Sequence, residues 1–131
     1  MSIVKKNVLV CITPQTNSKR LIDKGSQIAG EGKLHIFHMQ RGNSVFDDSN
    51  AGKLLEELFD YGKTKGGMVH FLSEGDFYVS VRVFALSHKI TSIVLGEPPS
   101  ESMSRDDLKK RIAENLPGIE VIVLERPKDS I

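Results

Sequence analysis

Histidine is the residue of this sequence whose spacing could first suggest chemistry, because a cluster of imidazoles can bind a metal ion. The four histidines are His35, His38, His70 and His88. His35 and His38 share one predicted strand, and an offset of three places their side chains on opposite faces, where they cannot bind one metal together. His70 is alone on another predicted strand, and His88 ends a predicted helix, where a cationic imidazole suits the helix dipole. We therefore interpret the four as unrelated polar residues and predict no metal site.

The single cysteine, Cys11, cannot form an internal disulfide. It lies within the apolar run 8–12, and no base or cation stands beside it in the sequence to lower its pKa. We expect a buried thiol that acts as a small core residue.

Motifs for catalysis are also missing from the sequence. It contains no Gly-x-Ser-x-Gly, no Cys-x-x-Cys and no Gly-x-x-x-x-Gly-Lys-Ser/Thr. Asp47 and Asp48 lie in a polar stretch, whereas Asp106 and Asp107 fit the first turn of a helix, where negative charge is favourable without any catalytic role. No nucleophile, base and orienting group can be assembled, so we expect a protein that acts by binding and not by catalysis.

The elements that must position any site follow from the alternation of short β-branched runs with segments of helical period. Strands are expected at 7–13, 34–39, 68–72, 90–96 and 119–125. Apolar stripes predict helices around 21–29, 54–59, 76–88 and 108–116. This pattern predicts one α/β domain over residues 1–131, a doubly wound parallel sheet with helices on both faces.

Segment 76–88 satisfies two patterns. Its three valines partly alternate, which favours a strand, whereas Phe77, Val81 and Ala85 form a helical stripe that begins after a good N-cap, Asp76. Parallel strands need a crossover that is usually a helix, so we predict a helix.

Helix ends are marked by capping residues and glycines. Thr16 or Asn17 is expected to cap the first helix, and Ser104 with Asp107 resembles a capping box for the last. The glycines expected to end the first two helices are Gly30, Gly32, Gly62, Gly66 and Gly67.

Charge and hydropathy limit the classes of partner. The chain has 18 Lys and Arg against 17 Asp and Glu, so no net field attracts nucleic acid or an anionic membrane. No apolar run approaches the roughly 20 residues that span a bilayer, and residues 1–7 are too short and too charged for a signal peptide. We predict a cytoplasmic protein with no nucleic-acid partner and no membrane insertion.

The expected place for a ligand follows from the sheet. In open parallel sheets, ligands bind outside the carboxyl ends of the strands, where the strand order reverses. If the first and fourth strands are neighbours, the segments that follow these two strands line the expected binding site. The turn after the second strand then forms one side of it. The candidate ligand-binding residues are Thr13, Pro14, Gln15, Met39, Gln40, Gly96 and Glu97.

Three stretches, in order along the chain, carry a family resemblance. They are VLVCITPQTNSKRLI at 8–22, Gly75-Asp76 followed by Phe84-Ala85 and ITSIVLG at 90–96, and LPGIEV at 116–121. They resemble the universal stress protein (UspA-like) superfamily, and most of all the cytoplasmic stress-protein-like domain of KdpD-type potassium sensor kinases. The resemblance implies a five-stranded sheet in the order 3-2-1-4-5, a role in stress response or signal transduction, and a chain that is either free-standing or a piece of a larger sensor.

Members of that family that bind ATP typically have an aspartate after the first strand and Gly-x-x-Gly-x9-Gly-Ser/Thr after the fourth. Here Thr13 and Pro14 follow the first strand, and Pro99 stands where the second glycine would be, after Gly96. Glycines let backbone amides approach phosphates, whereas proline has no amide to offer. The resemblance thus implies a chain outside the typical ATP-binding subclass, with no cofactor. The hydroxyls left as phosphate donors are those of Ser102 and Ser104.

Some KdpD-type domains resemble cyclic di-AMP receptors, with a Ser-x-Ser element after the first strand and an aromatic-containing element after the second. The corresponding segments here are 13–15 and 37–40. An adenine nucleotide or cyclic di-AMP is therefore the alternative ligand.

The leading hypothesis is a regulatory module that binds a signalling protein or a second copy of itself. The last strand is short, apolar and at a sheet edge, where unpaired backbone groups can bind another strand. Its candidate dimer residues are Ile119, Val121 and Val123. An ordinary edge, protected by Glu125, Arg126 and Pro127, is the equal alternative.

Overall fold

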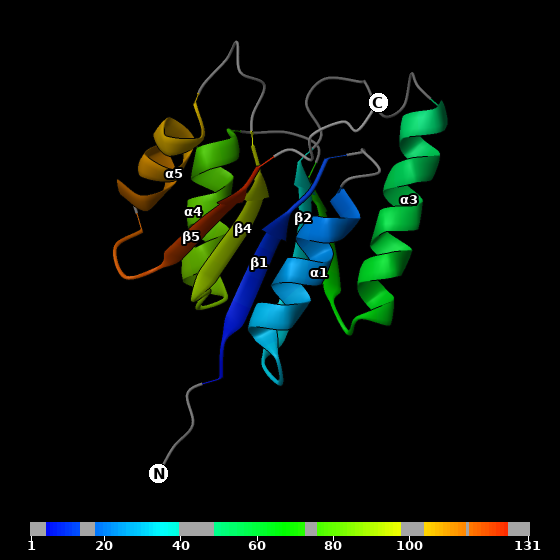
Figure 1. Ribbon diagram of the computed structural model, residues 1–131, viewed down its shortest axis with the longest axis horizontal. Helices are drawn as coiled ribbons and strands as arrows, with labels where there is room; N and C mark the ends of the chain where they lie inside the picture. The colour runs from blue at the N-terminus through cyan, green and yellow to red at the C-terminus, as the bar shows by residue number, and fades with distance from the viewer. Residues whose placement is uncertain are drawn as a thin grey trace.

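The protein forms a single parallel sheet between two layers of helices (Figure 1). The structure is a computed structural model that describes residues 5–13, 18–39, 49–72, 76–97, 104–114 and 116–125. In chain order the elements are β1 (Asn7–Cys11), α1 (Ser18–Ala29), β2 (Lys33–Met39), α3 (Ser49–Thr64), β3 (Met68–Leu72), α4 (Phe77–Ser87), β4 (Ser92–Gly96), α5 (Arg105–Glu114) and β5 (Glu120–Leu124). The strand order β3-β2-β1-β4-β5 confirms the predicted doubly wound fold.

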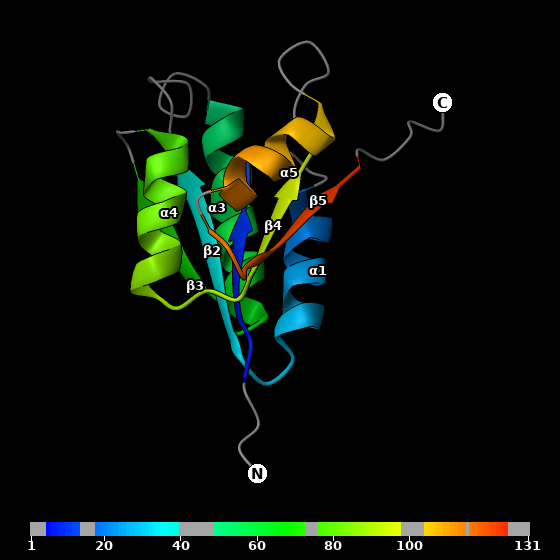
Figure 2. The same ribbon diagram turned by 90° about the vertical axis from the view of Figure 1, so that its left-hand side faces the viewer.

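The two faces of the sheet carry separate hydrophobic cores. Because successive side chains of a strand point to opposite faces, Leu9 packs in the core beneath α4 and α5, whereas Val8 and Val10 pack beneath α1 and α3. Figure 2 shows these two helical layers on either side of the sheet. Cys11 is buried in the first of these cores, and burial raises the pKa of its thiol to about 12, which confirms the expected structural cysteine.

Segment 77–87 is a helix, as the topology predicts. The Asp76 side chain caps it by accepting a hydrogen bond from the Val79 amide at 3.0 Å. Of its three valines only Val81 is buried, whereas Val79 and Val83 are exposed. A strand would have placed all three on one face, so the burial pattern follows the helical period.

Several predicted boundaries need correction. β1 ends at Cys11 instead of 13, β4 begins at Ser92 instead of 90, and α5 ends at Glu114, so the buried Leu116 packs beyond the helix. α3 continues through Gly62, which was expected to end it. A Cβ at Gly62 would lie 2.0 Å from the Ile36 Cδ1 atom, so this glycine permits close packing of the helix on the sheet.

The glycines expected after the helices behave differently. Gly30 and Gly66 take the left-handed backbone conformation, with φ of 56° and 81°, and follow the ends of α1 and α3 as predicted. The predicted caps Thr16 and Asn17 lie outside the described residues. No helix in the described part of the chain has the length and hydropathy to cross a membrane.

Candidate functional site

The carboxyl ends of β1, β2 and β4 meet at one edge of the sheet, because all strands are parallel and β1 lies between β2 and β4 (Figure 1). Thr13, Gly96 and Glu97 follow or end these strands, as predicted. Met39 ends β2, but its side chain is buried in the core beneath α4 and α5. Four predicted site residues lie outside the described residues: Pro14, Gln15, Gln40 and Ser102.

Several polar groups at this edge already have partners within the fold. The Thr13 carbonyl accepts a hydrogen bond from the Ser18 hydroxyl at 2.7 Å. The Glu97 amide donates to the Leu124 carbonyl at 2.9 Å and so extends the sheet. The Ser104 hydroxyl oxygen accepts from the Asp107 amide at 3.1 Å, which confirms the predicted N-cap of α5 and leaves the hydroxyl proton as the group that Ser104 can offer.

His38 lies in segment 37–40, which the sequence analysis compared with a cyclic di-AMP element without giving His38 a role of its own. It is the penultimate residue of β2, and its ring Nδ1 lies 2.9 Å from the Ile12 carbonyl oxygen. A carbonyl can only accept, so Nδ1 carries the proton, and Nε2 of the neutral ring is a hydrogen-bond acceptor. Nε2 is buried and has no hydrogen-bond partner among the residues that the structure describes. An unsatisfied buried group costs about 1–3 kcal/mol, so this nitrogen offers a place for an N–H or O–H donor.

The other three histidines form a cluster with Phe84 at the opposite end of the sheet. His35 on β2, His70 on β3 and His88 at the C-cap of α4 have ring centroids 5.0 to 5.7 Å apart. His35 Nδ1 and His70 Nε2 are 3.1 Å apart. The expectation that these histidines are unrelated is therefore wrong. The separation of His35 from His38 on opposite faces is as predicted, because His38 shares the face of Ile36, which packs beneath α1 and α3.

Two members of the His35–His70–His88 cluster, His35 and His70, have a lowered pKa, chiefly because of burial. Burial lowers the pKa of His35 to about 4, assisted by the charges of His70, His88 and Lys33. Burial and the neighbouring His88 also lower the pKa of His70. Within the ranges that the structure describes, no three His, Cys, Asp or Glu side chains are arranged to hold a metal ion. The three rings pack with Phe84 between α4 and the sheet.

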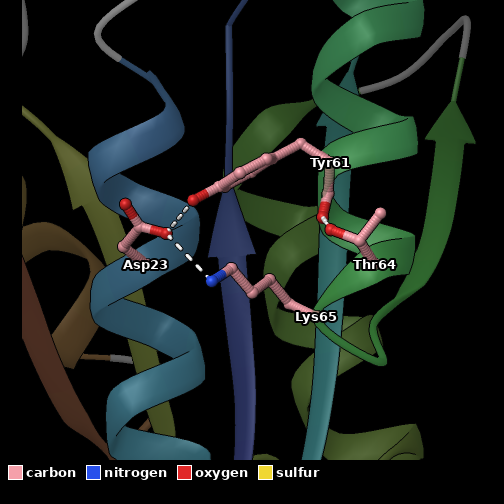
Figure 3. Close-up of polar contacts among 4 residues, drawn as sticks. All are labelled: Asp23, Tyr61, Thr64 and Lys65. Atoms are coloured by element: carbon pink, nitrogen blue, oxygen red, sulfur yellow. Dashed lines mark hydrogen bonds and ion pairs between the residues drawn. The ribbon is translucent and has the colours of Figure 1, made fainter.

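A surface contact joins α1 to α3 across the other face of the sheet (Figure 3). The Tyr61 hydroxyl donates to the Asp23 carboxylate, and Lys65 Nζ lies 3.9 Å from the same oxygen. The hydrogen bond to Asp23 is the main cause that raises the pKa of Tyr61. Thr64 donates to the Tyr61 carbonyl at 2.6 Å. Asp23, Tyr61 and Lys65 also line a shallow groove. The other residues that line it are Arg20, Lys24, Ser26, Gln27 and Leu124. Its mixed charges indicate a link between helices and not a site for one class of ligand.

The two outer strands of the sheet, β3 and β5, differ in how far their apolar side chains are exposed. On β3, Met68, Phe71 and Leu72 are 50%, 40% and 38% exposed. Of the predicted dimer residues, Val121 on β5 is buried, and Val123 on β5 and Ile119 just before it are partly buried against the core beneath α4 and α5. Sequence patterns did not single out β3 as an exposed apolar edge, because its residues resemble those of any core strand.

No protein-family model matches the sequence, and no curated protein matches it. Among solved structures, the chain is similar to a universal stress protein from Archaeoglobus fulgidus, with a TM-score of 0.66 and 15% identity over 92% of this chain and 93% of that one. It is also similar to a universal stress protein in complex with cAMP (TM-score 0.64, 17% identity, 92% and 97%). A third is a universal stress protein family member from Burkholderia pseudomallei (TM-score 0.62, 13% identity, 91% and 95%). The fold is therefore that of the universal stress proteins.

Proposed function

We propose that this chain, with its universal stress protein fold, is a regulatory stress-response module that acts by binding a protein partner, either a signalling protein or a second copy of itself. One observation carries the proposal. Every large hydrophobic side chain that is exposed among the described residues belongs to β3 or α4. They are Met68, Phe71, Leu72, Val79, Val83 and Leu86. Phe71 lies on the other face of the sheet, beside His38, so we call the remaining five residues the β3–α4 surface.

The β3–α4 surface belongs to two elements that pack directly on one another. The Phe84 ring of α4 lies edge-on to the His70 ring of β3, with centroids 4.6 Å apart. Figure 2 shows α4 beside β3 at one side of the molecule. Concentrated apolar exposure typically marks a protein contact, since burial returns roughly 25 cal/mol for each Å² removed from water.

Site-specific photocrosslinking in cells tests this proposal. A photoreactive amino acid is placed at Val83 in the full chain, and the matched control carries it at the exposed Gln27 on α1, on the other face. We expect a discrete protein adduct from position 83 and none from position 27. Equal, diffuse labelling at both positions, or no adduct at position 83, would refute a protein contact at this surface.

Binding of an adenine nucleotide or cyclic di-AMP is the second candidate function, and His38 supports it. Its buried Nε2, which has no partner in the described part of the chain, is an acceptor, and the exocyclic amine of adenine is an N–H donor. One structure with the same fold holds cAMP.

Calorimetry with ATP, AMP, cAMP and cyclic di-AMP tests the second candidate function. We expect one of them to give a binding heat, with affinity lowered at least tenfold in His38→Phe and unchanged in Gln27→Ala. If none of the four nucleotides gave a binding heat, this function would be rejected. If His38→Phe bound the nucleotide with the affinity of the natural sequence, His38 would have no part in the binding.

A further inference from the structure

The outer face of α4 is apolar, although the outer face of a surface helix is usually polar. Val79, Val83 and Leu86 are 52%, 53% and 65% exposed, while Val81 and Ala85 on the inner face are buried. The exposed faces of α1, α3 and α5 carry charged side chains instead. A helix that is apolar on both faces is typically buried on both, so the outer face of α4 fits a helix that a partner covers.

The three exposed side chains of α4 form a straight stripe. Val79, Val83 and Leu86 are spaced by four and then three residues, which is the spacing of the d, a and d positions of a heptad. Valine at a and leucine at d are residues that two-stranded coiled coils favour. An extended strand matches such a stripe poorly, because its side chains repeat every two residues. The stripe is therefore suited to a second helix.

Charge on the flanks of the stripe limits which helix can bind. Arg82 is exposed at the g position on one flank, and Ser80 and Ser87 hold the e positions on the other. Lys89, which follows α4, is exposed as well. α4 and β3 contain no Asp or Glu. These two elements therefore offer cations and no carboxylate, which complements a helix with acidic side chains at its own e or g positions.

We infer that the outer face of α4 binds an amphipathic helix of another protein, whose apolar a and d stripe is flanked by Glu or Asp. This inference rests on the proposed function and defines the chemistry of its protein partner. In Figure 2, α4 lies at one side of the molecule.

A second copy of α4 does not supply the acidic side chain that this pattern requires. In an antiparallel pair about a two-fold axis, Arg82 would lie beside Arg82 of the second copy, where like charges repel. In a parallel pair, Arg82 would face the neutral Ser87 of the second copy. Neither arrangement places a carboxylate beside Arg82, so a different protein fits this face better.

Two synthetic helical peptides, each about three heptads long, provide the probes for the purified full chain. Both carry valine at a and leucine at d. One has glutamate at every e and g position, and the other has lysine there, so that like charges keep each peptide from pairing with itself. Fluorescence anisotropy of the labelled peptides, with the chain at up to about 200 µM, measures the two dissociation constants. We expect the glutamate peptide to bind at least tenfold more tightly than the lysine peptide.

Variants at exposed positions test the stripe and its flank separately. Val83→Lys should weaken binding of the glutamate peptide at least tenfold, whereas Gln27→Lys on α1, on the other face of the sheet, should leave it unchanged. Arg82→Glu should lower the preference for the glutamate peptide at least fivefold. Lys53→Glu makes the same change of charge on α3 and should leave that preference unchanged. Circular dichroism checks that each variant is folded.

Three results would overturn the inference: no binding of the glutamate peptide up to about 200 µM, equal affinity for the two peptides, or equal effects of Arg82→Glu and Lys53→Glu. The proposed function is tested separately. A protein adduct from position 83 in cells would still support a protein contact, and the failure of the peptides would then show that the partner is not an acidic amphipathic helix.

Discussion

Lowering the pH should destabilise the protein through His35. The pKa of this buried imidazole falls from 6.5 to about 4 on folding, so the unfolded chain binds a proton more readily than the folded one. The stabilisation is present above pH 6.5 and is lost as the pH falls from there toward 4.

The size of this loss of stability follows from the shift in the pKa of His35. The full shift in pKa, from 6.5 to about 4, corresponds to at most about 3.4 kcal/mol, because one pKa unit equals about 1.36 kcal/mol. Solvent near the exposed His88 screens part of its electrostatic interaction with His35. At pH 5, only part of the pH interval between 6.5 and about 4 has been crossed. We expect the free energy of unfolding to be about 1–2 kcal/mol lower at pH 5 than at pH 7.

Urea unfolding followed by circular dichroism, at half-unit steps from pH 7.5 to 5, measures this loss. The comparison variant is His35→Phe, which keeps an aromatic ring beside Phe84 but cannot titrate. Its absolute stability is not the readout, because the substitution also removes the contact with His70 Nε2. We expect the variant to lose much less stability over this range than the natural sequence. Equal slopes in the two proteins would refute the assignment of the pH dependence to His35.

Three further predictions concern packing, capping and the thiol. Gly25→Ala should lower the free energy of unfolding by about 1–3 kcal/mol in urea melts, because its Cβ would lie 2.2 Å from Val10 Cγ2, although alanine favours a helix; a more stable variant would contradict this close approach. Asp76→Ala should cost about 1 kcal/mol in the same assay through loss of the α4 cap, and an unchanged midpoint would show that the cap is dispensable. Cys11 should react with a thiol reagent only after unfolding in urea, because burial raises its pKa to about 12; rapid reaction of the folded protein would contradict its burial.

Local patterns and chain topology were sufficient to predict the parallel sheet and the helices, whereas the strand order came from the family resemblance. Segment 77–87 shows why, since its valines alone favoured a strand and the need for a crossover decided for the helix. The boundaries at Gly62 and Leu116 could not be predicted in this way, because they depend on contacts with distant residues, such as the approach of α3 to Ile36.

The His35–His70–His88 cluster was missed for a physical reason. Each histidine is isolated in its own element, and they meet only because the register of β2 with β3 pairs Phe37 with His70 and brings His35 diagonally beside it. The predicted strand order contained this signal, since neighbouring strands with histidines on one face bring them into contact. The exposure of apolar side chains on β3 likewise depends on the position of this strand at the end of the sheet.

The central claim is that the β3–α4 surface is covered by protein in the cell. The apparent mass of the full chain in fresh extract, measured by size-exclusion chromatography, tests it most directly. We predict elution well above the 14.5 kDa monomer for the natural sequence, and elution as a monomer for the double variant with Met68→Lys and Val83→Lys. A natural chain that elutes as a 14.5 kDa monomer, indistinguishable from the double variant, would contradict the claim.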